Sequence, residues 1–169
     1  MPRIDFYILP EQAPNGRPAL ACRLTEKAYG QNHKVYIQAA SAEQARLLDD
    51  LLWTFRQGSF IPHALCPPDD TDLPPVLIGW EDSPALAARL FSVSSPTTNP
   101  DNQPAADELV AGTVLINLSP DVPAAFERFE RVAELVDQEP QTLAKSRERF
   151  RYYREHGYTP ASHKLPGQS

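Results

Sequence analysis

The chain of 169 residues and 18.8 kDa is long enough for one domain with a full hydrophobic core, and we predict a single domain over residues 1–169. Its hydrophobic fraction is 41%, but no apolar run approaches the roughly 20 residues that a membrane span needs, so we expect no membrane protein. The formal net charge of −6 argues against a protein that coats nucleic acid, because that function usually requires a broadly basic surface.

The two cysteines indicate the compartment. Cys22 and Cys66 lie far apart in the sequence, and neither belongs to a CxxC motif or has a nearby histidine pair. Reduced thiols in a cytoplasmic protein are the simplest explanation, and a metal site is not expected. The N-terminal segment MPRIDFYILP is too short and too soon interrupted for a signal peptide, and it is more typical of a first strand.

The first 40 residues predict a β-α-β unit. Residues 4–9 (IDFYIL) and 34–39 (KVYIQA) are rich in β-branched and aromatic residues, as strands are. Residues 18–30 between them predict a helix, with Pro18 in its first turn and Gly30 at its end. This length suits a crossover between parallel strands.

The clearest helix begins near residue 41. Ser41 and Gln44 have the spacing of a capping box, and Gly58 follows the end of the helix. Trp53 falls on the polar side, where it is either buried beneath a neighbouring loop or part of a protein interface. The apolar stripe comprises Leu47, Leu48, Leu51, Leu52 and Phe55.

The middle of the chain predicts more strands of a mostly parallel sheet. Residues 59–63 (SFIPH) form a short strand or turn, and residues 75–80 (PVLIGW) and 113–118 (TVLINL) are apolar throughout, as strands buried on both faces are. A short helix is expected over residues 83–90. Residues 93–109 have the composition of a flexible excursion.

Two helices are predicted to close the chain. The first begins at Asp121, presents an apolar side that includes Val136, and is broken by Pro140. The second, the basic helix over residues 141–156, contains five lysines or arginines and two glutamates, whereas the rest of the chain is strongly acidic. After Gly157 the tail, residues 159–169, is rich in proline and expected to be poorly ordered.

The basic helix is the first candidate for a binding site. At about 100° per residue, Arg147, Phe150, Arg151 and Arg154 fall within an arc of roughly 100°, with Lys145 and Arg149 on the far side. Guanidinium groups around an aromatic ring suit an anionic partner that also offers an apolar contact. The alternative is a solvated helix face with intrahelical ion pairs such as Arg151 with Glu155.

Motifs for nucleotide and hydrolase chemistry are missing. The sequence has no GxGxxG, no GxxxxGK[ST] and no GxSxG, and its four histidines have no metal-binding or triad spacing. His63 is best explained as a structural hydrogen-bonding residue. We therefore predict a binding module with no cofactor and no catalytic residues, rather than an enzyme.

Several short segments, in this order and spacing, resemble one family. They are FYIL at 6–9, LLW at 51–53, SFIPH at 59–63, PVLIGW at 75–80, LINLS at 115–119 and RERFRYYREHGY at 147–158. Together they resemble the chi subunit of bacterial DNA polymerase III. The stretch 81–112 is longer than the usual connection in that family.

The resemblance implies an α/β fold with three layers, α/β/α, around a mostly parallel five-stranded sheet, Rossmann-like but without a phosphate-binding loop. It also implies a non-catalytic adaptor with two partners: the psi subunit of the clamp loader and the acidic C-terminal tail of single-stranded DNA-binding protein (SSB). DNA is then reached only through SSB. The alternative is a module that binds single-stranded nucleic acid directly.

The resemblance assigns residues to each partner. Trp53 and Phe60 match the aromatic pair at the psi interface. The SSB tail, an aspartate cluster followed by Ile-Pro-Phe and a free carboxylate, is assigned to the basic helix and a pocket wall on the preceding helix: Arg147, Phe150, Arg151, Arg154 and Val136.

Overall fold

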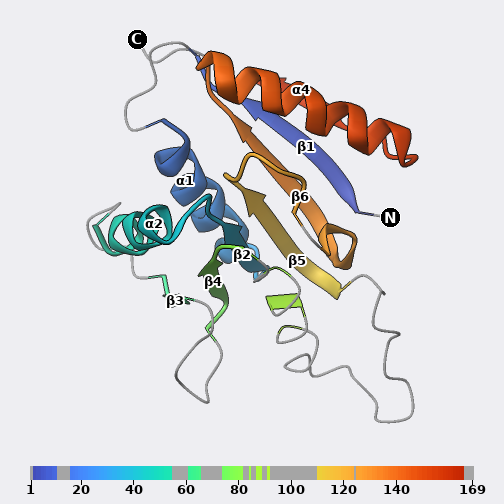
Figure 1. Cartoon of the computed structure of the whole chain (residues 1–169). Helices are drawn as coiled ribbons and strands as arrows, with labels where there is room; N and C mark the ends of the chain where they lie inside the picture. The colour runs from blue at the N-terminus through green and yellow to red at the C-terminus, as the bar shows by residue number, and fades with distance from the viewer. Residues whose placement is uncertain are drawn as a thin grey trace, which may run out of the picture.

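The computed structural model describes residues 2–10, 16–54, 61–65, 74–81, 84, 87–88, 91, 110–123 and 125–165. Within these residues one seven-stranded sheet has the order β3-β4-β2-β5-β6-β1-β7 (Figure 1), and each pairing of neighbouring strands is parallel. The strands are β1 (Arg3–Ile8), β2 (Lys34–Gln38), β3 (His63–Leu65), β4 (Val76–Gly79), β5 (Val110–Asn117), β6 (Phe129–Val136) and β7 (Ala161–Lys164).

Helices cover both faces of this sheet. On one face α1 (Gly16–Gly30) and α2 (Ala42–Thr54) pack against an apolar cluster that includes Val35 and Ile37. On the other face lie α4 (Pro140–Glu155), a short 3-10 helix (Phe126–Arg128), and a second cluster that includes Tyr36. Alternate residues of the central strands thus enter different cores, which explains why these strands are apolar throughout.

The fold class is confirmed: an open, Rossmann-like α/β sheet between helical layers. The expected number of five strands is wrong, since the sheet has seven within the described residues. Both additional strands, β6 and β7, come from the last third of the chain.

The helix that we predicted between Asp121 and Pro140 is replaced by the 3-10 helix and by β6. Strand β6 lies between β1 and β5 and is buried on both faces: Val132 and Val136 belong to one core, Ala133 and Leu135 to the other. Such a strand shows no two-residue alternation of apolar and polar residues, so its sequence also fits helical periodicity. Val136 is therefore a strand residue.

Residues 161–164, in the tail that we expected to be poorly ordered, form strand β7 beside β1. Asp5 of β1 holds this edge together, because its carboxylate lies 2.9 Å from Nε2 of His163 and 3.3 Å from Nη2 of Arg131. Arg3 adds an ion pair at 3.3 Å, and the ring of Tyr7 stacks on that of His163 with a centroid distance of 5.1 Å.

The predicted capping box of α2 is present in a shifted form. The N–H of Gln44 donates to Oγ of Ser41 at 3.2 Å, whereas Oε1 of Gln44 accepts from the N–H of Ala40 at 2.7 Å rather than from Ser41. Within the apolar stripe, Leu48 and Leu52 are buried, whereas Leu47 is 48% exposed.

Some predicted features cannot be compared fully. Phe55, Phe60, most of residues 82–90 and the excursion 93–109 lie outside the described residues, although positions 84, 87 and 88 have helical backbone. No helix in the described part of the chain is long and apolar enough to cross a membrane.

The Asp5 cluster makes the stability of the fold depend on pH. Burial opposes ionisation of Asp5, but the hydrogen bonds from His163 and Arg131 and the charge of Arg3 outweigh it, so the pKa of Asp5 is lowered from 3.8. The folded pKa therefore lies below the unfolded one. The carboxylate contributes its full stabilisation above the unfolded pKa, and this is lost as the pH falls through the folded pKa.

Replacing Asp5→Asn should reduce the free energy of unfolding by about 1–2 kcal/mol near neutral pH. The difference from the wild type should shrink as the pH falls from the unfolded pKa of Asp5 through its lower folded pKa, because the carboxylate becomes protonated first in the unfolded and then in the folded protein. Urea denaturation at several pH values measures this, with Asp50→Asn on the exposed side of α2 as the control. A difference that stays constant down to acidic pH would refute the role of the Asp5 carboxylate.

Candidate functional site

Helix α4 is fixed on the sheet by a buried polar network. Glu134 of β6 is 0% exposed, and Arg149 and Tyr153 of α4 are 3% and 0% exposed. Oε1 of Glu134 accepts from Nε of Arg149 at 3.0 Å and from Nδ2 of Asn117 at 2.8 Å, and Oε2 accepts from the hydroxyl of Tyr153 at 2.6 Å. A further hydrogen bond joins Nη1 of Arg149 to the carbonyl oxygen of Pro120 at 2.8 Å.

The protonation of this network follows from its burial. Burial raises the pKa of Glu134 above its ordinary value, against the charge of Arg149 and the donated hydrogen bonds. Burial and the neighbouring Glu134 raise the pKa of Tyr153, so its hydroxyl keeps its proton and acts as a donor. Arg149 is thus removed from the basic surface, since its charge is matched inside the protein.

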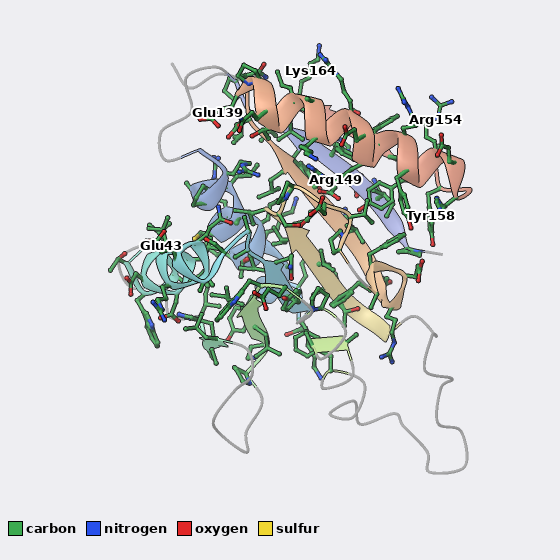
Figure 2. The ribbon with its side chains drawn as sticks, viewed as in Figure 1. Glu43, Glu139, Arg149, Arg154, Tyr158 and Lys164 are labelled. Atoms are coloured by element: carbon green, nitrogen blue, oxygen red, sulfur yellow. The ribbon has the colours of Figure 1, made fainter. Side chains whose placement is uncertain are left out.

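The arginines that we assigned to the site lie on the outer side of α4. Arg147, Arg151 and Arg154 are exposed, and Figure 2 shows Arg154 extending toward solvent while Arg149 turns toward the sheet. Among the described residues no ion pair joins any of these three to a carboxylate, whereas Lys145 pairs with Glu148 at 3.7 Å. The alternative of a helix face neutralised by intrahelical pairs is therefore not supported for them.

An apolar strip runs beside these arginines. Phe150 is half-buried and packs against Phe6 of β1, with ring centroids 5.3 Å apart. Leu143 of α4 and Ile8 of β1 are also partly buried against the same core. Val136, at 2% exposure, lies beneath them as a floor rather than as an open wall. The structure thus brings the residues that we predicted for the SSB tail to one side of the molecule.

Sequence reasoning missed one further cation of this surface. Lys164 of β7 is in register with Ile8 of β1, and paired residues of neighbouring strands point to the same face of a sheet. Because Ile8 belongs to the α4 side, exposed Lys164 does too. The sequence ASHK has no apolar alternation that would have indicated a strand, so the position of Lys164 follows only from the pairing of β7 with β1.

Helix α2 carries an exposed aromatic side chain. Trp53 is 49% exposed, and its ring lies 4.4 Å from the ring of His63 on the edge strand β3. The ring nitrogens of His63 contact the carbonyl oxygens of Ile61 at 2.7 Å and Asp49 at 3.1 Å. These contacts fit the predicted structural role of His63, whose ring also packs against that of Trp53. Phe60 lies outside the described residues.

The comparisons with known proteins identify the family. The family model described as DNA polymerase III chi subunit, HolC, matches residues 1–161. A protein of Pseudomonas aeruginosa named DNA polymerase III subunit chi is 37% identical over 166 residues, which cover 98% of this chain and 99% of the relative. The chain belongs to the DNA polymerase III chi subunit family.

A more distant chi subunit, from Haemophilus influenzae, is 26% identical over 155 residues and covers 91% of each chain. The resemblance drawn from the short segments is therefore confirmed. As a chi subunit, the protein has an accessory role in DNA replication by DNA polymerase III. Within the described residues there is no group of three or more side chains that could hold a metal ion.

The buried network of this chi subunit should respond cooperatively to substitution. Glu134→Leu leaves the cation of Arg149 buried without a counter-ion and should destabilise the protein by about 3–5 kcal/mol. Arg149→Met should cost less, because Glu134 keeps two donors and its raised pKa favours protonation. The double variant should recover part of the loss of Glu134→Leu. Urea denaturation of all four proteins tests this, and strictly additive losses would contradict it.

Proposed function

We propose that this protein is a non-catalytic adaptor that binds the psi subunit of the clamp loader and the acidic C-terminal tail of SSB. It thereby tethers the DNA polymerase III holoenzyme to the protein-coated lagging-strand template in the cytoplasm. The polymerase reaction itself belongs to other subunits. One observation carries the proposal: three exposed arginines without ion pairs among the described residues lie beside a half-buried aromatic ring, on a protein of net charge −6.

The chemistry of the SSB tail fits the outer side of α4. Arg147, Arg151 and Arg154 offer guanidinium donors for the aspartates and the terminal carboxylate. The strip of Phe150, Leu143 and Ile8 offers an apolar contact for the terminal phenylalanine ring. Lys164 adds a cation from the sheet edge.

The net negative charge of the protein favours a partner that offers apolar as well as ionic contacts over an anion bound by its charge alone. With a net charge of −6, the protein repels polyanions except where cations gather, so both apolar and ionic contacts are needed for binding. Since the arginines are exposed, their contribution is screened by salt, and the affinity for the tail should fall as the salt concentration rises.

Direct binding of single-stranded nucleic acid is the second candidate. Tyr152 is 37% exposed, and its ring stacks on that of His156 with a centroid distance of 4.0 Å, beside the arginines of α4. Exposed aromatic rings among cations are also how proteins hold unpaired bases. The acidic charge of the remaining chain opposes this alternative.

Arg147→Ala and Arg151→Ala should each weaken binding of a peptide with the SSB tail sequence by about tenfold, because each removes a charge-assisted contact. Isothermal titration calorimetry measures the effect, with Arg23→Ala on the exposed side of α1 as the control of equal charge change. Unchanged affinity in both variants would remove α4 as the tail site. If an unmodified oligonucleotide binds as tightly as the peptide, direct nucleic-acid binding becomes the better explanation.

Trp53→Ala should abolish copurification with psi and leave tail binding intact, since Trp53 lies on α2 and the tail site on α4. The matched control is Leu47→Ala, which truncates another exposed apolar side chain of α2 at 48% exposure. Circular dichroism of the variant shows whether it folds. Loss of both partners together with the fold would mean that Trp53 is a structural residue, and normal psi binding would place the psi interface elsewhere.

A further inference from the structure

Strand β7 is an edge of the sheet within the described residues, and its outer side offers free peptide groups there. The N–H of Leu165 donates to the carbonyl oxygen of Ile8 of β1 at 2.9 Å. In a parallel ladder every second residue bonds to the same neighbour, so His163 also directs its peptide groups toward β1. The peptide groups of Ser162 and Lys164 therefore point outward. Both residues are exposed, and each offers one donor and one acceptor to a further strand.

This edge adjoins the proposed tail site. Ser162 is in register with Phe6 of β1, which faces the core beneath α4. Lys164 is likewise in register with Ile8, which belongs to the same core. The ring of Phe150 contacts that of Phe6 at a centroid distance of 5.3 Å. A strand added outside β7 would lie about 4.8 Å further along the sheet, beside the flank of α4 that follows Phe150.

That flank of α4 carries cations and no carboxylate of the helix. Arg149 faces β6, and Phe150, about 100° further round the helix, faces β1. In the same direction Arg154 and Arg147 follow at about 140° and 160° from Arg149, toward β7, whereas both glutamates of the helix lie at about 240–260°. Figure 2 shows Lys164 and Arg154 on the side of α4 opposite to Arg149.

Charge selects the kind of strand that this edge accepts. A lysine on an exposed edge disfavours pairing with another copy of the same edge. The net charge of −6 on each copy of the chain also opposes such pairing. An extended acidic peptide has the complementary charge, because every second side chain of an added strand would face the side of Lys164 and Arg147.

The acidic tail of SSB has the chemistry for this edge. Its aspartate cluster supplies carboxylates together with peptide N–H and C=O groups. The proline that follows has no N–H, so strand pairing ends there. The terminal phenylalanine is then left for the apolar strip that contains Phe150.

We propose that the acidic tail binds as an added strand on the outer edge of β7, with peptide hydrogen bonds to Ser162 and Lys164 and alternate aspartates facing Lys164 and Arg147. This inference rests on the proposed function, since it describes how the same tail is held. It adds a requirement on the backbone of the peptide, which side-chain contacts with α4 alone do not impose. Main-chain pairing supplies affinity, and the alternating side chains supply specificity.

The first test methylates the backbone nitrogens of a tail peptide one at a time. Only alternate N–H groups of an added strand face β7, so binding measured by calorimetry should weaken about tenfold at every second aspartate and hardly at the positions between. The charge of the peptide is the same throughout, so each peptide is a control for the next. Equal effects at successive positions, or no effect at any, would overturn the proposal.

The second test removes the outward N–H from the protein. Ser162→Pro leaves the bonds between β7 and β1 intact, and an edge strand tolerates proline where the N–H faces solvent. It should weaken peptide binding about tenfold, whereas Ser162→Ala keeps the peptide group and should bind as the wild type does. Wild-type affinity in Ser162→Pro, with weakened binding in Arg147→Ala, would overturn strand addition and leave the tail site on α4. No binding by the wild-type protein would overturn both.

Hydrogen exchange in the wild-type protein decides even if Ser162→Pro fails to fold. Saturating peptide should slow exchange of the amides of Ser162 and Lys164 by about tenfold. The amide of His163 should change much less, because it already bonds to β1. Unchanged exchange at Ser162 and Lys164 would overturn the proposal. Slow exchange that depends on protein concentration without peptide would identify a second copy of the chain as the occupant and would overturn it too.

Discussion

The ion pair between Glu134 and Arg149 is the interaction on which the candidate surfaces of α4 depend. Glu134 lies on β6, inside the sheet, and Arg149 lies near the middle of α4. The 3.0 Å contact therefore fixes the position of the helix along its axis and its rotation about that axis. Tyr153 and Asn117 complete the hydrogen bonds of the carboxylate. A buried pair of this kind adds little net stability, but it strongly disfavours any other rotation, because rotating α4 would leave two buried charges unmatched.

This constraint separates the cations of α4 by position. Arg149 is buried in its ion pair with Glu134. Arg147, Arg151 and Arg154 face solvent on one flank of α4, and Lys145 lines a cavity on the other flank. The charge of the helix, counted from the sequence, therefore overstates its outer basic surface. The arginines on the outer flank lie next to Phe150, whose ring is held by Phe6 beneath it. A fixed aromatic between cations favours a short acidic peptide with an apolar end over a uniform polyanion.

The sequence predicted the parts of the fold whose local signals agree. Strands β1, β2, β4 and β5 and helices α1, α2 and α4 were found because their composition and end signals point the same way. Strand β6 was missed because a strand buried on both faces has no alternation, and Glu134 was missed with it, since a glutamate in a predicted helix is unremarkable. No local pattern shows that a charge will be matched 15 residues later across two elements.

The exposure of the arginines and of Trp53 could be predicted from the sequence, whereas their roles stay predictions. Exposed positions of a helix follow from angular spacing alone, so Arg147, Arg151 and Arg154 were placed on the outer flank without knowledge of the sheet. Trp53 was similarly recognised as lying off the apolar stripe, and it is 49% exposed. Lys164 could not be found this way, because its neighbour Ile8 is distant in sequence and the two meet only through the pairing of β7 with β1.

The arrangement of the sheet bears on whether the two proposed partners bind at the same time. Trp53 and His63 lie at the β3 edge on the face covered by α2, whereas Phe150 lies over β1 on the opposite face. Strands β4, β2, β5 and β6 separate the two surfaces (Figure 1). Partners at these positions do not compete for space, and a close-packed, hydrogen-bonded sheet lies between them. We therefore expect the two proposed interactions to be energetically independent, as a tether requires: tension between clamp loader and template is carried by the hydrogen-bonded sheet, without weakening either contact.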